Sequence, residues 1–127
     1  ALYVTRDGQQ AFRSMVIEAY WRCALTGCDV EAVLEAAHIV PYVEAASNVI
    51  ANGLCLRADI HKLYNRNLIR IGPDYTVSVS SRLAGSAYAE LAGRKLRLPA
   101  KGADRPDAHL LSVRHRFIKT TFEERTG

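Results

Sequence analysis

The chain has 127 residues, of which 49% are hydrophobic and 24% are charged. These values are ordinary for one globular domain and argue against both a disordered protein and a multidomain enzyme. The longest apolar runs are too short to cross a bilayer, so we expect no membrane partner. The sequence starts at Ala1 and shows no secretory signal, and we expect a single domain over 1–127 that is a fragment of a longer chain.

Charge is distributed unevenly along the chain, whose net charge is +4. Residues 1–61 contain four Lys or Arg and seven Asp or Glu, a balance of −3, whereas residues 62–127 contain thirteen and six, a balance of +7. An anionic polymer would therefore be held mainly by the second half. A basic face that is merely solvated explains the charge pattern equally well.

The three cysteines, Cys23, Cys28 and Cys55, are an odd number in a chain that can build a core without disulfides. This usage favours a reducing compartment, and we expect a cytoplasmic protein. We interpret the three as buried free thiols, with a zinc site formed by them and a histidine as the alternative.

The first predicted element is an amphipathic helix that starts near Asp7 and Gly8. Its apolar residues recur at the three- and four-residue spacing of one helix face, namely at Phe12, Met15, Val16, Ala19 and Tyr20. The following residue, Trp21, is expected in the core rather than in contact with nucleic acid bases.

The middle of the chain is predicted to fold as strand, loop, strand and helix. The latter part of 33–40 is an extended strand that stops before Pro41, and 42–52 is a loop. A second strand runs through 54–56, and a short helix follows with His61 and the core residues Leu63 and Tyr64. Asp59 is the expected N-cap of this helix.

The remaining elements are a hairpin, a short helix and a terminal helix. The segments 68–71 and 75–80 flank the turn at 72–74, 86–91 is a short helix, and 101–106 is a loop. The terminal helix after Pro106 has an apolar face with Leu110, Leu111, Val113, Phe117 and Ile118, and its other face displays Arg114, Arg116 and Lys119. The predicted fold class is α+β.

Three polar residues stand where the central elements begin or end. His38 ends the first strand, Asn52 precedes the second strand and His61 lies in the first turn of the helix, at separations of 14 and 9 residues. Such an arrangement creates a polar cleft between a strand end and a helix face. Imidazole is the side chain best suited to proton transfer near neutral pH and also to metal ligation.

The surrounding segments carry a family resemblance. They read AAHIVP at 36–41, SNVIANGL at 47–54 and DIHKL at 59–63. The sequence resembles the HNH (His-Asn-His) endonucleases, and its flanks at 10–13, 22–28 and 96–99 resemble HNH domains of bacterial modification-dependent restriction endonucleases. The resemblance implies a ββα-metal core, to which this chain adds an N-terminal helix, a further β-hairpin and a C-terminal helix.

The resemblance also implies the catalytic roles. His38 is the expected general base that takes a proton from the attacking water, and Asn52 braces the loop that orients it. His61 is the expected ligand of a divalent cation, Mg, Mn, Ni or Zn, that stabilises the scissile phosphate and the departing 3′ oxygen. Asn52 and Asp59 are further candidate metal ligands. Many members carry Asp immediately before the base, where this chain has Ala37, so water and phosphate are expected to fill the remaining coordination positions.

Basic residues near the proposed metal helix are the candidate nucleic-acid contacts, namely Arg57, Lys62, Arg66 and Arg70. Such contacts position a phosphate backbone without reading its sequence. We therefore expect sequence or modified-base specificity in another domain of the intact protein, and we also consider a homodimer. The resemblance implies a metal-dependent DNA endonuclease. A catalytically impaired nucleic-acid-binding module of the same fold and a structural zinc domain remain as alternatives.

Overall fold

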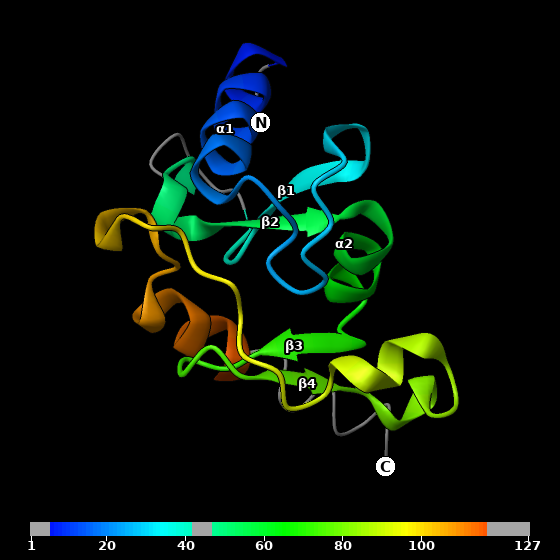
Figure 1. Ribbon diagram of the computed structural model, residues 1–127. Coiled ribbons are helices and arrows are strands. Elements are labelled where there is room, and N and C mark those ends of the chain that lie inside the picture. Colours follow the sequence, from blue (N-terminus) through cyan, green and yellow to red (C-terminus); the bar gives the residue numbers. More distant parts are fainter. Residues whose placement is uncertain (1–5, 42–46, 117–127) are drawn as a thin grey trace.

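The computed structural model describes residues 6–41 and 47–116. In chain order it contains helix α1 (Arg6–Tyr20), strands β1 (Leu34–His38) and β2 (Gly53–Arg57), helix α2 (Ala58–Asn65), strands β3 (Ile69–Ile71) and β4 (Val77–Val79), and a helix over 108–116. Figure 1 shows β1 and β2 between α1 and the β3–β4 hairpin. The α+β class and the β1–β2–α2 core with its three additions are as predicted.

Helix α1 packs its apolar face on the first hairpin. Phe12, Val16 and Tyr20 are buried, as their helical spacing predicts, whereas Met15, expected on the same face, is 38% exposed. The approach to β2 is so close that a Cβ on Gly53 would lie only 2.5 Å from Val16 Cγ2. Glycine at this position therefore allows α1 to lie directly on the strand.

The first hairpin sets the register of the site. Strands β1 and β2 are antiparallel, with Leu34 opposite Arg57 and His38 opposite Gly53. Helix α2 follows β2 without a loop and buries Ile60 and Tyr64. Consequently His38 is fixed at the loop end of the hairpin, whereas the helix begins at the opposite, open end, after Arg57.

The second hairpin is joined to the first through the segment that follows α1. Strands β3 and β4 pair with Ile71 opposite Val77. The backbone N–H of Ala24 donates to the Cys55 carbonyl on β2, while the Ala24 carbonyl accepts from the N–H of Arg97. One continuous hydrophobic core covers both hairpins, the helices and Leu111.

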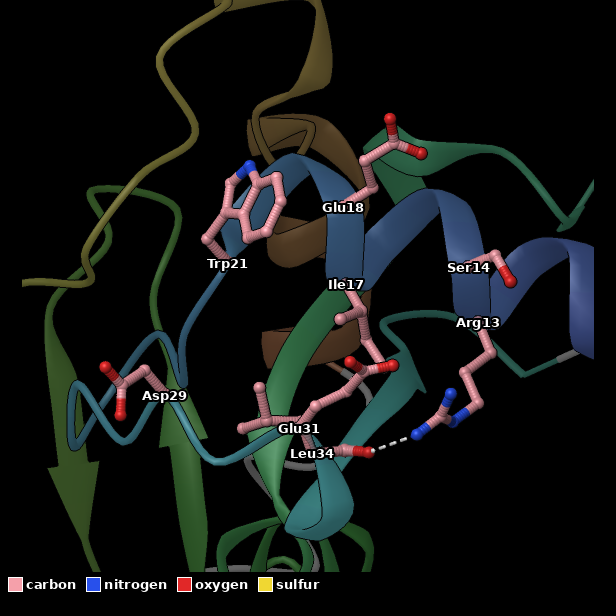
Figure 2. A pocket seen from close by; sticks show the side chains of 8 residues that line it. All are labelled: Arg13, Ser14, Ile17, Glu18, Trp21, Asp29, Glu31 and Leu34. Carbon is pink, nitrogen blue, oxygen red and sulfur yellow. Dashed lines mark hydrogen bonds between the residues drawn. The ribbon is translucent and has the colours of Figure 1, made fainter.

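Trp21 corrects one sequence expectation. Its side chain is 72% exposed rather than part of the core. The reason is local, because α1 ends at Tyr20 and Trp21 adopts a left-handed backbone conformation with φ of 64°. Figure 2 shows its ring at the edge of an open pocket of about 280 Å³, which Glu18, Asp29 and Glu31 also line. Leu63 is partly buried and Tyr64 fully buried, as expected.

The start of α2 is a second correction. The N-cap residue is Arg57, which makes no capping hydrogen bond through its side chain, and Asp59 lies inside the first turn. Asp59 is therefore not the N-cap. As an acidic group in the first turn, its charge is still favourable toward the helix dipole.

Arg114 is a third correction, because it does not belong to a solvated basic face. Its guanidinium donates to the carbonyl oxygens of Ile39 (2.9 Å) and Tyr64 (2.9 Å). It also lies over the Tyr64 ring, 3.7 Å from the centroid. Burial lowers the pKa of Arg114 from its ordinary value, with the nearby Tyr64 acting in the opposite direction. The helix over 108–116 is thus fixed to the ends of β1 and α2.

Smaller elements agree in place and differ in type. The predicted helix at 86–91 is a 3-10 helix (Ala87–Leu91) capped by Ser86, and the loop at 101–106 includes a 3-10 turn (Gly102–Asp104). The expectations for 42–46 and for Phe117, Ile118 and Lys119 lie outside the described residues. Over the ranges that the structure does describe, every helix falls short of the length and apolar character needed to cross a membrane.

Candidate active site

His38 is held from two directions at the end of β1. Its ring stacks on that of Phe12 from α1, with centroids 4.2 Å apart and planes 5° from parallel. Its Nε2 lies 2.8 Å from the side-chain oxygen of Asn48. The ring is partly exposed, so it keeps access to solvent.

Asn52 stabilises the loop between the two strands through side-chain hydrogen bonds. The side chain is buried, with a relative exposure of 2%. Its Oδ1 accepts from the N–H of Val40 (2.9 Å), and its Nδ2 donates to the carbonyl oxygens of Val40 (3.1 Å) and Ser47 (2.9 Å). These bonds join the residues after β1 to those before β2. The bracing expected of Asn52 thus has a structural basis, whereas the direct hydrogen bond to His38 comes from Asn48.

His61 lies on α2 and faces β1. Its Nδ1 is 2.7 Å from Oε1 of Glu35. The His61 side chain is 21% exposed and that of Glu35 is 48% exposed. His61 is therefore reachable from solvent and has a carboxylate as its neighbour.

Asp59 makes different contacts. Its Oδ1 accepts from Arg57 Nε (2.6 Å), and its Oδ2 accepts from Arg57 Nη2 (2.9 Å) and from the hydroxyl of Tyr88 (2.8 Å). The hydrogen bond from Arg57 is the main reason that the pKa of Asp59 falls to about 2, and the bond from Tyr88 acts in the same direction. Both carboxylate oxygens thus have partners other than His61.

An open groove of about 330 Å³ runs beside His38. It is lined by residues of α1 and β1, namely Gln9, Phe12, Arg13, Glu35, Ala36 and His38. The groove brings the candidate base beside an exposed arginine and beside the carboxylate that contacts His61. Arg13, Glu35 and Asn48 are not among the site residues predicted from the sequence. Asn48 could have been predicted, because it lies in the family-like segment 47–54. The place of Arg13 in the groove could not, because it depends on how α1 packs on β1.

The predicted phosphate-contacting residues lie around α2 and β3. Lys62 and Arg66 are exposed, whereas Arg57 is committed to Asp59 and Arg70 is only partly exposed. The structure therefore presents Lys62 and Arg66 to solvent more fully than the other two.

The candidate metal site does not have a full set of protein ligands among the described residues. Among the described residues, no group of three or more His, Cys, Asp or Glu side chains is arranged to hold an ion. His61 nevertheless fits a cation ligand, because ligating histidines commonly donate their second ring N–H to a carboxylate. Such a site leaves coordination positions for water and phosphate, as hard divalent cations accept.

The three cysteines are free thiols. Cys23 and Cys55 are buried and Cys28 is partly buried. Burial is the main reason that the pKa of Cys55 rises to about 12. Their burial thus agrees with the prediction of buried free thiols.

A ββα unit with one histidine at the end of its first strand and another on its helix is the arrangement that the HNH resemblance implies. The model of a family described as HNH endonuclease matches residues 23–72, which include β1, β2, α2 and β3. Residues 23–72 are therefore similar to the HNH endonuclease family.

A solved structure entitled "Modification dependent TagI restriction endonuclease" has a similar fold, with a TM-score of 0.63 and 20% sequence identity. The match covers 84% of this chain but only 37% of that chain. A search of curated proteins found no match. The family match is thus to endonucleases, and the solved structure shows a shared fold.

Proposed function

We propose that residues 1–127 form one nuclease domain that hydrolyses DNA phosphodiester bonds with the help of a divalent cation. The observation that carries this proposal is the fixed orientation of His38 beside an open groove. Phe12 defines the plane of its ring and Asn48 bonds to one of its nitrogens, while Arg13 lines the same groove.

His38 is the general base in this proposal. The carbonyl oxygen of the Asn48 amide can only accept a hydrogen bond, so Nε2 of His38 must donate. In this role His38 takes the proton from the attacking water. Because stacking and hydrogen bonding fix the ring before substrate arrives, little orientation has to be achieved during the reaction.

Positive side chains would hold the substrate backbone. Arg13 is exposed in the His38 groove, and Lys62 and Arg66 are exposed on and just after α2. Arg57 and Arg70 remain candidates with weaker support, since Arg57 is paired with Asp59. These groups would position phosphates rather than read bases.

His61 is the proposed cation ligand. A divalent cation bound there would neutralise charge on the scissile phosphate and on the departing 3′ oxygen. We assign Asn52 to bracing the loop, because its amide is engaged by three backbone groups. Asp59 is the weakest of the candidate ligands because Arg57 and Tyr88 bond to its carboxylate. Mg, Mn, Ni and Zn are the cations to test.

The chain spans 37% of the length of the solved restriction endonuclease. We propose that it too is part of a longer cytoplasmic protein, in which another domain recognises the sequence or a modified base. A homodimer would place two such sites on the two strands of a duplex.

Cleavage of supercoiled plasmid tests the proposed activity. We expect cutting in the presence of Mg, Mn, Ni or Zn ions, and we expect a chelator to stop it. His38→Ala should abolish cutting, whereas His109→Ala is the matched control because His109 is exposed on the terminal helix. Substantial cutting by His38→Ala would exclude His38 as the base. DNA binding without cutting under all four cations would favour the binding-module alternative.

A further inference from the structure

Glu35 makes a contact that neither the family match nor the predicted site explains. Its Oε1 lies 2.7 Å from His61 Nδ1 and thus joins β1 to α2. A carboxylate has no hydrogen to donate, so Nδ1 is the donor. The neutral imidazole of His61 therefore has its lone pair on Nε2, the nitrogen that remains for a cation.

The contact is not needed to attach the helix. Helix α2 is already fixed by Ile60 and Tyr64, both fully buried, and by the Arg114 bond to the Tyr64 carbonyl. Glu35 is 48% exposed, and ion pairs at such positions add little to stability. What the contact does define is the orientation of the His61 ring.

Asp59 does not compete for this position. It is two residues before His61, but Arg57 bonds to both of its oxygens and Tyr88 to one of them. Arg57 and Tyr88 thereby hold the Asp59 carboxylate elsewhere. Of the two acidic residues considered, Glu35 is the one that contacts the ring.

Strand β1 also links Glu35 to the candidate base. Glu35 and His38 are three residues apart on this strand, about 10 Å in extended chain, and both line the same groove. A single rigid strand therefore fixes the base directly and the proposed ligand through Glu35.

We propose that Glu35 is a positioning residue that sets the tautomer and ring orientation of His61 for binding a divalent cation. This inference rests on the proposed function, in which His61 is the ligand. It assigns to Glu35 an outer-shell role, since a carboxylate behind a ligating histidine fixes the ring and strengthens its basicity.

The first test measures cation affinity without substrate. Mn²⁺ or Ni²⁺ is titrated calorimetrically into the protein and into its Glu35→Ala, Glu35→Gln and His61→Ala variants. We expect Glu35→Ala to weaken binding by about 10- to 100-fold. Glu35→Gln, which keeps an acceptor oxygen but loses the charge, should fall between Glu35→Ala and the parent. Glu31→Ala is the matched control, because it removes an exposed negative charge from the turn just before β1.

The second test reads the His61 tautomer by long-range proton–nitrogen NMR correlation in the cation-free protein at a pH where the ring is neutral. The parent should show the proton on Nδ1, and Glu35→Ala should shift the population toward Nε2. Thermal unfolding of Glu35→Ala should remain close to that of the parent. An unchanged tautomer in Glu35→Ala would overturn the positioning role, including the case in which binding is lost as completely as in His61→Ala.

The two proposals fail in different ways. If His61→Ala binds the cation as well as the parent does, the ligand assignment in the proposed function fails. If His61→Ala loses binding and Glu35→Ala keeps it, only the role of Glu35 is overturned.

Discussion

The ring of Phe12 lies flat on the imidazole of His38, with planes 5° apart. Phe12 also belongs to the buried face of α1, so one side chain couples the helix to the candidate base. Phe12→Leu should keep an apolar group there while removing the flat support. We expect a loss of about 1–2 kcal/mol in the free energy of unfolding and a roughly tenfold lower cleavage rate. Urea unfolding and plasmid cleavage would measure the two effects.

Val16→Ala is the control for this prediction. It removes buried packing from the same helix face but leaves the Phe12–His38 stack in place. Its rate at a temperature where the protein is fully folded should match that of the parent. Equal rates for Phe12→Leu and Val16→Ala would show that the aromatic support has no catalytic effect.

Asn48 is expected to matter through the His38 tautomer. Asn48→Ala removes the acceptor at Nε2, so the proton can move to the other nitrogen and the ring can turn. We expect a fall in kcat of about 10- to 100-fold with little change in KM. Asn48→Asp, which retains an acceptor oxygen, should recover part of the rate. A lack of recovery together with an unfolded far-UV spectrum would point instead to a structural role.

Asn52 should contribute mainly to stability. Asn52→Ala leaves one backbone N–H and two carbonyl groups without their present partner. We expect a loss of about 2–3 kcal/mol in the free energy of unfolding, because unsatisfied buried polar groups are costly. Chemical denaturation gives the value directly. A loss below about 0.5 kcal/mol would mean that water replaces the amide well.

A side chain at Gly53 should disturb the packing of α1 on the same hairpin. A Cβ at this position would meet Val16 Cγ2 at 2.5 Å and Phe12 Cζ at 3.0 Å, so Gly53→Ala must push α1 away from β2. We expect destabilisation of about 1–3 kcal/mol. Displacement of Phe12 should also lower cleavage in the folded fraction. Gly102→Ala is the control, because nothing lies within 4 Å of a Cβ there.

We expect the buried Cys55 thiol to affect both the pH dependence of stability and the order in which the cysteines are alkylated. Burial raises the pKa of Cys55 to about 12, so this thiol stays protonated in the folded protein at pH 8.5. Unfolding lowers its pKa toward the ordinary value of 9.0. The free energy of unfolding that it contributes is thus fully present below pH 9 and is lost as the pH rises toward 12. Timed alkylation with iodoacetamide and mass spectrometry should find Cys28 modified before Cys55. Early labelling of Cys55 in folded protein would contradict the buried state.

The central elements followed from the sequence because their signals are local. Helical spacing located α1. Strand and turn signals, together with the family-like segments, placed His38 at a strand end, Asn52 just before a strand and His61 on the following helix. Contacts across the fold were not predictable in the same way. The Glu35–His61 contact depends on how α2 packs on β1, and the second partner of Asp59, Tyr88, comes from a distant 3-10 helix.

Two further differences have geometric causes. Trp21 was expected in the core, but the left-handed conformation after α1 leaves its side chain exposed. Arg114 looked like part of a basic surface, yet its long side chain reaches two carbonyl groups that end other elements. Hydrophobic periodicity predicts which face of a single helix is buried. It does not predict contacts that a long side chain makes with other elements.

The two hydrogen bonds from Arg114 have a consequence for the boundaries of the proposed nuclease domain. They bridge the exit of β1 and the last turn of α2 from a helix that lies well beyond the family-matched residues 23–72. A fragment limited to those residues would lack the Arg114 contacts and would expose the Tyr64 ring that Arg114 covers. The shortest autonomous piece should therefore extend through 116, and attempts to transplant the motif alone into another scaffold should need a substitute for that guanidinium.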